Sequence, residues 1–128
     1  MKIRVYYEDT DAGGIVYHAN YLKYCERARS EFFFSQGLTP IIDGAHFVVR
    51  KMDCDFINSA LFADIIEVTS KIKVINKASF VMIQEIQKEE KILFHTEVTL
   101  VLVKDSRPQR INKNIKDMLQ SLFAKIDK

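Results

Sequence analysis

The sequence predicts an α+β fold in which an antiparallel β-sheet wraps around one long central helix. Three observations lead to this prediction. Residues 20–36 have a helical pattern, apolar and polar residues alternate in several segments between about 47 and 104, and a second amphipathic pattern ends the chain. A chain of 128 residues has the common size of one domain, so we expect residues 1–128 to form a single domain.

The first elements are a short strand and the long helix. The segment from Lys2 to Tyr7 is rich in β-formers, and turn-forming residues follow it between Glu8 and Gly14. Within 20–36, apolar residues recur every three or four positions and should form one buried face, with Lys23, Arg27 and Ser30 pointing the other way. The predicted buried face consists of Tyr21, Leu22, Cys25, Ala28, Phe32 and Phe33.

Four strands and a final helix complete the predicted fold. The strands are expected at 46–58, 64–75, 79–89 and 91–104, each with one buried face. One sheet edge should stay exposed, which favours dimerisation by edge pairing. The helix is expected over about 112–126, capped by Asn112 or Asn114. Its apolar stripe comprises Ile115, Met118, Leu119, Leu122, Phe123 and Ile126.

Composition narrows the class of protein. The 19 basic residues nearly balance the 17 acidic ones, and the net charge of +2 is too small and too scattered for a nucleic-acid surface. Cys25 and Cys54 lie in a helical and a strand-like pattern, so we read both as reduced core thiols. No apolar run approaches the roughly 20 residues that span a bilayer, and the first residues lack a signal core. A cytoplasmic location is expected.

The candidate catalytic residues lie in the stretch YYEDTDAGGIVYHANYLKYCERARSE, residues 6–31. Asp9 and Asp11 could simply be solvated turn residues. An acid beside the N-terminus of a buried helix, however, meets backbone N–H groups that also attract a developing oxyanion. Gly13 and Gly14 remove side chains that would block this approach. The pattern predicts acyl transfer, with Asp11, the acid nearer the helix, as general base or nucleophile.

Other candidate residues have two readings each. His18 could orient a carbonyl or a water, or be structural, and Tyr7 could hold the carboxylate or the substrate, or belong to the core. Arg29 lies on the buried helix face, where we expect an architectural ion pair with Glu26. His46 and His95 show no metal-ligand spacing and are read as structural, so no metal site is expected. Nucleotide-binding, dinucleotide-binding and serine-hydrolase motifs are missing from the sequence.

One run of spaced residues resembles a known family. The run comprises Tyr7, Asp9, Thr10, Asp11, Gly14, Val16, Tyr17, His18, Asn20, Tyr21, Glu26, Ala28 and Arg29. It resembles the signature of hotdog-fold acyl-CoA thioesterases of the 4-hydroxybenzoyl-CoA thioesterase type, and within them the YbgC branch. The resemblance implies a hotdog fold, edge-to-edge dimers, frequent homotetramers, and hydrolysis of acyl-CoA to a carboxylic acid and CoA.

The resemblance also implies roles for residues. The essential acid falls on Asp11, the oxyanion-hole amide falls near His18, and Tyr7 and the His18 side chain match positions associated with the active site. Val48, Val49 and Asn58 of a partner chain would line the pocket. No cofactor is implied, because CoA is part of the substrate.

The residues that would contact the CoA phosphates match the family pattern less completely. The stretch VINKASFV keeps the family's Ser79, Phe80 and Val81 but offers only Lys77 as a charge, so Lys77 is the predicted phosphate contact. Lys104, Arg107 and Arg110 are the other candidates.

Two other functions remain open on the sequence alone. The first is a non-catalytic hotdog module that binds acyl-CoA or acyl carrier protein in lipid metabolism. Asp11 with its glycine turn weighs against it, because a binding module has no evident use for an acid beside an oxyanion hole. A hotdog dehydratase is weaker still, because its histidine arrangement is missing. Acyl carrier protein also remains a candidate partner of a thioesterase in fatty acid metabolism.

Overall fold

The computed structural model describes residues 1–125. In chain order its elements are β1 (Lys2–Arg4), η1 (Tyr7–Asp9), α1 (Ala19–Phe34), β2 (Ile41–Ile42), β3 (Ala45–Phe56), β4 (Ile65–Ile75), β5 (Ser79–Lys88), β6 (Lys91–Lys104), β7 (Arg107–Pro108), α2 (Lys113–Leu122) and β8 (Ala124–Lys125).

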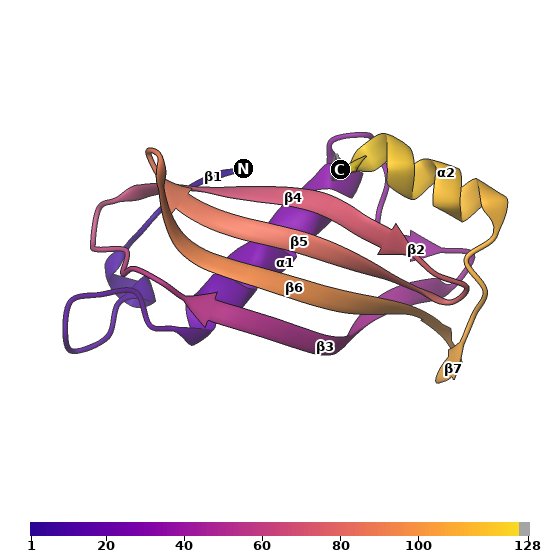
Figure 1. Cartoon of the computed structure of the whole chain (residues 1–128), viewed down its shortest axis with the longest axis horizontal. Coiled ribbons are helices and arrows are strands. Elements are labelled where there is room, and N and C mark those ends of the chain that lie inside the picture. Colours follow the sequence, from indigo (N-terminus) through magenta and orange to yellow (C-terminus); the bar gives the residue numbers. More distant parts are fainter. Residues whose placement is uncertain (126–128) are drawn as a thin grey trace.

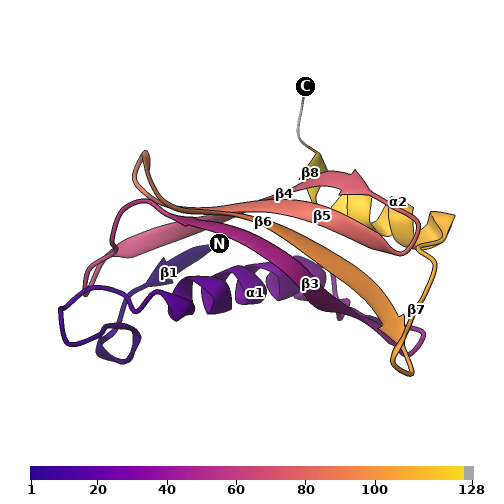
Figure 2. The same cartoon turned by 60° about the horizontal axis from the view of Figure 1, so that its bottom comes forward.

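The sheet curls over α1, so the predicted α+β arrangement is confirmed (Figures 1 and 2). Its strands follow the order β1-β4-β5-β6-β3-β2 with antiparallel neighbours, while β7 pairs with β6 and β8 pairs in parallel with β4. Figure 2 shows α1 beneath the concave face, and α2 lies along the β4 side of the sheet in Figure 1. The four long strands match their predicted ranges to within one or two residues.

The buried face of α1 largely follows its apolar spacing. Tyr21, Cys25, Ala28 and Phe33 are buried as predicted, and Tyr24 is buried as well. Tyr24 was missed because the curled sheet covers a wider face of the helix than a narrow apolar stripe indicates.

The first strand is shorter than predicted and ends at Arg4. Beyond it, Tyr7–Asp9 coil into a 3-10 turn in which the Asp9 N–H donates to the Tyr6 carbonyl over 3.0 Å. The Asp9 carboxylate in turn accepts from the Tyr6 N–H at 2.9 Å. This acid offers the backbone a local partner in place of a strand, which is why the β-formers at 6 and 7 do not extend β1.

The terminal helix is also shorter than the predicted 112–126 range. Asn112 is its N-cap, as one of the two predicted candidates, because its Oδ1 accepts from the Ile115 N–H at 2.9 Å. The helix ends at Leu122, Phe123 takes extended backbone angles, and Ala124–Lys125 pair with β4. Residue 126 lies outside the described residues.

One edge of the sheet is open. Strand β3 pairs with β6 on one side, while β2 covers only Ala45 and His46 on the other. From Phe47 to Phe56 the outer edge of β3 has no strand partner within residues 1–125. This is the exposed edge that the sequence predicted.

Candidate active site

Asp11 lies in a tight turn between η1 and α1. Its N–H donates to the Ile15 carbonyl at 2.9 Å, and its own carbonyl accepts from the Gly14 N–H at 3.0 Å. Gly14 has a φ of +80°, a backbone region that residues with a Cβ rarely adopt. Glycine at position 14 therefore permits the backbone conformation of the turn that holds Asp11.

The Asp11 carboxylate is exposed and oriented by its own turn. The Gly13 N–H donates to its Oδ1 at 2.8 Å. A Cβ placed on Gly13 would lie only 3.2 Å from that oxygen, so glycine permits the close approach. The other carboxylate oxygen has no hydrogen-bond partner within the described chain, which leaves it open to a water or a substrate.

His18 stands directly before α1 and is exposed. Its ring lies 4.5 Å from that of Tyr17 and meets Phe56 of β3 edge-on at 5.9 Å, measured between centroids. Over residues 1–125, no acceptor takes the backbone N–H of His18 or of Ala19. These donors lie at the positive end of the helix dipole, where a negative charge is stabilised.

Tyr7 is not a core residue, because 78% of it is exposed. Its ring stacks on Phe62, with centroids 4.2 Å apart and planes 12° from parallel. Phe62 lies in the connection between β3 and β4, and no periodic pattern in the sequence predicts this contact. The stack fixes the ring at the same end of the molecule as the Asp11 turn.

Asp9 is structural. Its carbonyl accepts from the Tyr17 N–H and from the Asn20 side-chain amide, both at 2.9 Å, and its carboxylate caps the 3-10 turn. Burial, and next the nearby Asp9 charge, raise the pKa of Tyr24. Asp9 and Asn20 thus tie the turn to the first residues of α1, a link that sequence reasoning missed because its partners are backbone atoms.

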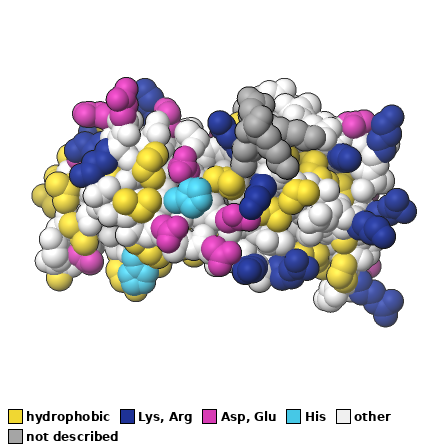
Figure 3. Space-filling view, in the orientation of Figure 1, with side chains coloured by type: hydrophobic (Ala, Val, Ile, Leu, Met, Phe, Trp, Pro, Cys, Tyr) yellow, Lys and Arg dark blue, Asp and Glu magenta, His cyan; other side chains and the backbone are white. Residues whose placement is uncertain are grey.

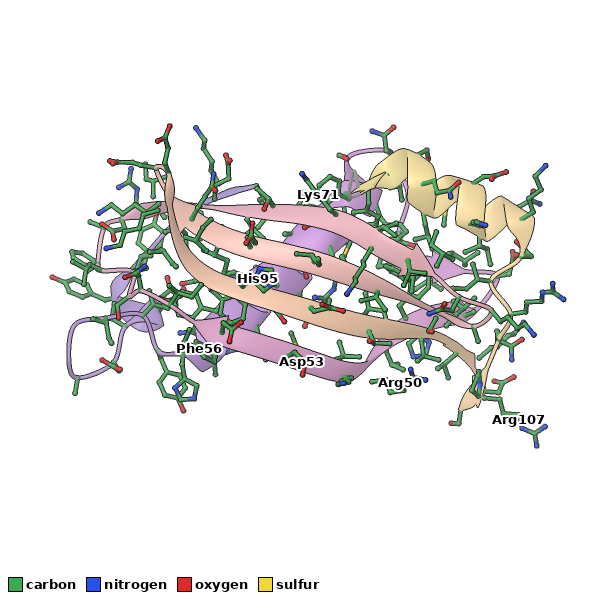
Figure 4. All side chains as sticks on the ribbon, viewed as in Figure 1. Arg50, Asp53, Phe56, Lys71, His95 and Arg107 are labelled. Atoms are coloured by element: carbon green, nitrogen blue, oxygen red, sulfur yellow. The ribbon has the colours of Figure 1, made fainter. Side chains whose placement is uncertain are left out.

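Tyr7, Asp11 and His18 belong to the segment between β1 and α1, which lies at the left end of the molecule in Figure 1. His18 contacts Phe56, which is labelled in Figure 4. No hydrogen bond joins their three side chains in the described part of the chain. The site is therefore open, with its groups held by separate elements.

Lys77 lies at the opposite end, in the turn between β4 and β5. Its carbonyl accepts from the Ile111 N–H at 2.7 Å. With Arg110, Lys113 and Lys116 it lines a hollow of about 530 Å³ at the start of α2, here called the basic hollow. Figure 3 shows the concentration of basic side chains at this end. The sequence predicted Lys77 and Arg110 separately, but not their meeting with α2.

A cavity of about 440 Å³ lies between the second half of α1 and β3. Its buried residues are Phe33, Phe80, Leu100 and Phe123, all apolar. Ser30 also lines it, so the prediction that Ser30 points away from the buried face was wrong. Strand β3 has a β-bulge between Val49 and Lys51, and Val49 lines the same cavity as Ser30.

The predicted pair of Arg29 with Glu26 does not form. Arg29 instead donates to the Gln84 Oε1 at 2.9 Å. Burial lowers the pKa of Arg29. The Gln84 amide nitrogen donates to the Cys25 carbonyl and to the Ser70 hydroxyl, each at 3.0 Å. A neutral partner costs less to desolvate than a carboxylate, and Glu26 stays exposed.

The remaining candidate groups are dispersed. His95 contacts Glu85 on the outer sheet face (Figure 4), with 2.8 Å between Nδ1 and Oε2, and His46 lies at the rim of the cavity. Within residues 1–125, no three His, Cys, Asp or Glu side chains gather in a metal-binding group. Cys25 is buried and Cys54 is half-buried, and both are free thiols. Burial raises the pKa of Cys25 to about 12.

In the described chain, neither helix has the length and apolar character needed to cross a membrane.

Comparison with known proteins assigns the family. The thioesterase superfamily model matches residues 13–94. The Helicobacter pylori protein named acyl-CoA thioesterase YbgC is 52% identical over 86 residues, which is 67% of this chain but only 65% of that protein. The Escherichia coli protein named acyl-CoA thioester hydrolase YbgC is 38% identical over 120 residues, covering 88% of this chain and 89% of that one.

The solved structures agree. The crystal structure of a probable thioesterase from Bartonella henselae superposes with a TM-score of 0.82 at 33% identity, covering 88% of this chain and 97% of that one. The likeness confirms the predicted hotdog fold. Because the family model matches more than half of its length, this chain belongs to the thioesterase superfamily.

Proposed function

We propose that this protein is an acyl-CoA thioesterase that hydrolyses acyl-CoA thioesters to a free carboxylic acid and CoA. The observation that carries the proposal is the Asp11 carboxylate, held by the Gly13 N–H in a turn that leads into α1. The names of the Helicobacter and Escherichia relatives support the same substrate class.

Two routes use the same groups. In the first, Asp11 takes a proton from a water whose oxygen bonds to the thioester carbonyl carbon. In the second, the carboxylate itself attacks that carbon and water later hydrolyses the anhydride. In both, the C–S bond breaks, CoA leaves as its thiolate and then accepts a proton, and the N–H groups of His18 and Ala19 stabilise the oxyanion.

Labelled water distinguishes the routes. In a single turnover in labelled water, an oxygen label in the Asp11 carboxylate shows direct attack followed by attack of water on the Asp11 carbonyl carbon of the anhydride, whereas the general-base route places the label only in the released acid. The His18 side chain would orient the carbonyl or the water, and the Tyr7 hydroxyl would contact the substrate from its stacked position on Phe62.

A homodimer would complete the site. Antiparallel pairing of two β3 edges sets the Asp11 end of one protomer beside the basic end of its partner. The phosphates of CoA would then meet Lys77 and the other cations of the basic hollow, since phosphates favour such clusters. Val48 and Val49 of β3 are exposed apolar residues at this edge, which supports the pairing, and Asn58 follows the same strand.

The wider assignment rests on chemistry and on the family. We place the enzyme in the cytoplasm, where the free Cys25 and Cys54 stay reduced. We assign it to fatty acid metabolism, with a homotetramer as a higher assembly of the dimers. Acyl carrier protein would be an alternative carrier of the acyl group, because the basic hollow suits an acidic partner. No cofactor is needed beyond the CoA of the substrate.

The test is thiol release from short-chain, long-chain and aromatic acyl-CoAs by wild type and Asp11→Asn. Loss of a general base should lower turnover by about 10² to 10⁴. Asp117→Asn, a neutralised exposed acid on α2, is the matched control and should keep wild-type turnover. Full activity in Asp11→Asn contradicts the assignment. If wild type binds acyl-CoA but releases no thiol, the protein is a binding module.

A further inference from the structure

The proposed reaction needs two groups that different stretches of backbone carry. The Asp11 carboxylate belongs to the turn after η1, whereas the N–H groups of His18 and Ala19, which have no acceptor within residues 1–125, lie at the start of α1. A thioester carbonyl must reach both at once, with its carbon toward the carboxylate or its water and its oxygen on the N–H groups. The distance between the turn and the helix therefore affects catalysis.

The hydrogen bonds of Asp11 itself do not set this distance. Its N–H, carbonyl and carboxylate bond to Ile15, Gly14 and Gly13, so all of these contacts stay within residues 11–15. They orient the carboxylate within the turn. Other groups must fasten the turn to α1.

The fastening point is the main-chain carbonyl of Asp9, two residues before Asp11. It accepts hydrogen bonds from the Tyr17 N–H and from Asn20 Nδ2, both at 2.9 Å. A carbonyl oxygen has two lone pairs, and both are used here. The two donors directly flank positions 18 and 19, which carry the proposed oxyanion donors. A single acceptor thus ties the turn to the backbone on either side of the oxyanion site.

Asn20 supplies the part of this link that depends on side-chain identity. Tyr17 donates through its backbone, as any residue except proline could, whereas the second donor is the side-chain amide of Asn20. Tyr24, one turn further along α1, also lies near Asp9, but its buried hydroxyl makes no hydrogen bond within the described chain. The side-chain contribution to the link therefore comes from Asn20.

Polar groups surround this link. The half-buried Asn20 lines a hollow of about 220 Å³ between η1 and α1. The other residues that line it are Glu8, Asp9, Lys23, Tyr24 and Arg27. Most of these side chains are charged, so hydrogen bonding rather than apolar packing holds the turn against this part of α1.

We propose that Asn20 is a positioning residue that fixes the distance from Asp11 to the N–H groups at the start of α1. This inference rests on the proposed thioesterase function and adds to it a residue that contacts no reacting atom. The hydrogen bond of Asn20 should matter in the transition state, where the carboxylate and the oxyanion site act together, and little in ground-state binding. Its loss should therefore lower kcat and leave the affinity for acyl-CoA unchanged.

The first test removes the donor but keeps the volume. Asn20→Leu is close to isosteric and adds no charge near the oxyanion site. We expect kcat for thiol release to fall about tenfold, because misplacement of catalytic groups by about 1 Å can cost up to about 10² in rate. The Kd of a non-hydrolysable thioether analogue of the acyl-CoA should stay within about twofold of wild type. Asn20→Ala lacks the same donor and should show the same loss in kcat.

Ser35→Ala is the matched control. The Ser35 hydroxyl donates to the Phe32 carbonyl at 3.0 Å, so this substitution removes another side-chain to main-chain hydrogen bond of α1, at the opposite end of the helix. It should keep the wild-type kcat and Kd. All variants should unfold cooperatively at a midpoint well above the assay temperature, so that folded proteins are compared.

A double substitution separates positioning of Asp11 from a general effect on the fold. In Asp11→Asn no carboxylate remains to be positioned, so adding Asn20→Leu should change the residual turnover by less than about twofold. This residual rate is measured with enzyme in excess over acyl-CoA. A further loss of about tenfold in the Asp11→Asn background would show that Asn20 acts on the fold or on the oxyanion site alone, which contradicts the inference.

The results distinguish this inference from the proposed function. If wild type and Asn20→Leu release thiol equally fast, or if Asn20→Leu raises Kd without lowering kcat, Asn20 does not position the site, while the thioesterase function stands. If wild type releases thiol from no acyl-CoA, the proposed function fails, and this inference fails with it.

Discussion

The backbone N–H of Gly13 donates a 2.8 Å hydrogen bond to the Asp11 carboxylate. The acid is therefore oriented by the peptide two residues further on, without a side chain from another element. Such a turn can hold a carboxylate in one direction at the protein surface, where burial supplies no restraint. The glycine is as much a part of the site as the acid.

Gly13→Ala should reduce turnover without unfolding the protein. The new Cβ would lie 3.2 Å from Asp11 Oδ1, so the carboxylate must shift by a few tenths of an ångström. Misplacement of a catalytic group by about 1 Å can cost up to 10² in rate, and we expect a loss on the order of tenfold in kcat. Gly37→Ala serves as control, because its added Cβ meets no atom within 4 Å and only backbone strain remains. Wild-type kcat in Gly13→Ala would show that the turn does not position Asp11.

Much of the fold could be predicted from the periodicity of apolar residues in the sequence, whereas the partners of individual side chains could not. The α1 stripe and the four long strands were predictable because each buries one face at a fixed repeat. The ends of β1 and α2 were not, because Asp9 captures the backbone in a local turn and Phe123 leaves the helix for the β4 edge.

In the candidate site, too, local features could be predicted from the sequence and contacts between distant residues could not. The Asp11 turn and His18 are local in sequence, so spacing and resemblance located them. The Tyr7–Phe62 stack and the Arg29–Gln84 bond each join residues 55 apart in the chain, and no local pattern reports such pairs. The basic hollow likewise needs the docking of α2 against the β4–β5 turn.

Gln84 should be critical for stability. It is fully buried and bonds to Arg29, the Cys25 carbonyl and Ser70. Gln84→Leu would leave the desolvated Arg29 guanidinium without its partner and remove hydrogen bonds to the Cys25 carbonyl and Ser70, so we expect a loss of about 2–4 kcal/mol in the free energy of unfolding. Denaturant titration measures it. Gln87→Leu, on the same strand with a half-buried side chain, is the control, and an equal loss there would refute the network's role.

The β3 edge should determine the oligomeric state. Val48→Lys puts a charge on the open edge, and we expect dimers to dissociate to monomers because edge pairing would bury that charge. Light scattering after size-exclusion chromatography gives the mass directly. Ile65→Lys is the matched control, since Ile65 is a similarly exposed apolar strand residue on the other side of the sheet. A wild-type dimer that persists in Val48→Lys would place the interface elsewhere.

The contact of Asp64 with Lys88 should make stability depend on pH in acid. Burial alone would raise the pKa of Asp64, but hydrogen bonds from Lys88 Nζ at 2.8 Å and the Leu61 N–H at 2.9 Å outweigh it and lower the pKa. A carboxyl whose pKa is lower in the folded chain stabilises the fold above its unfolded pKa of about 3.9. That contribution is lost as the pH falls through the folded value.

The difference in unfolding free energy between wild type and Asp64→Asn should therefore be largest above pH 5 and shrink toward pH 3, as measured by urea titration at each pH. Asp105→Asn is the control, because Asp105 is an exposed turn residue, and it should show no such trend. A difference for Asp64→Asn that stays constant between pH 6 and pH 3 would mean that Lys88 and Leu61 do not favour the ionised carboxylate. The connection between β3 and β4 would then be held by its backbone hydrogen bonds, such as that from the Val5 N–H to the Asp64 carbonyl at 2.9 Å, and by the stack of Phe62 on Tyr7.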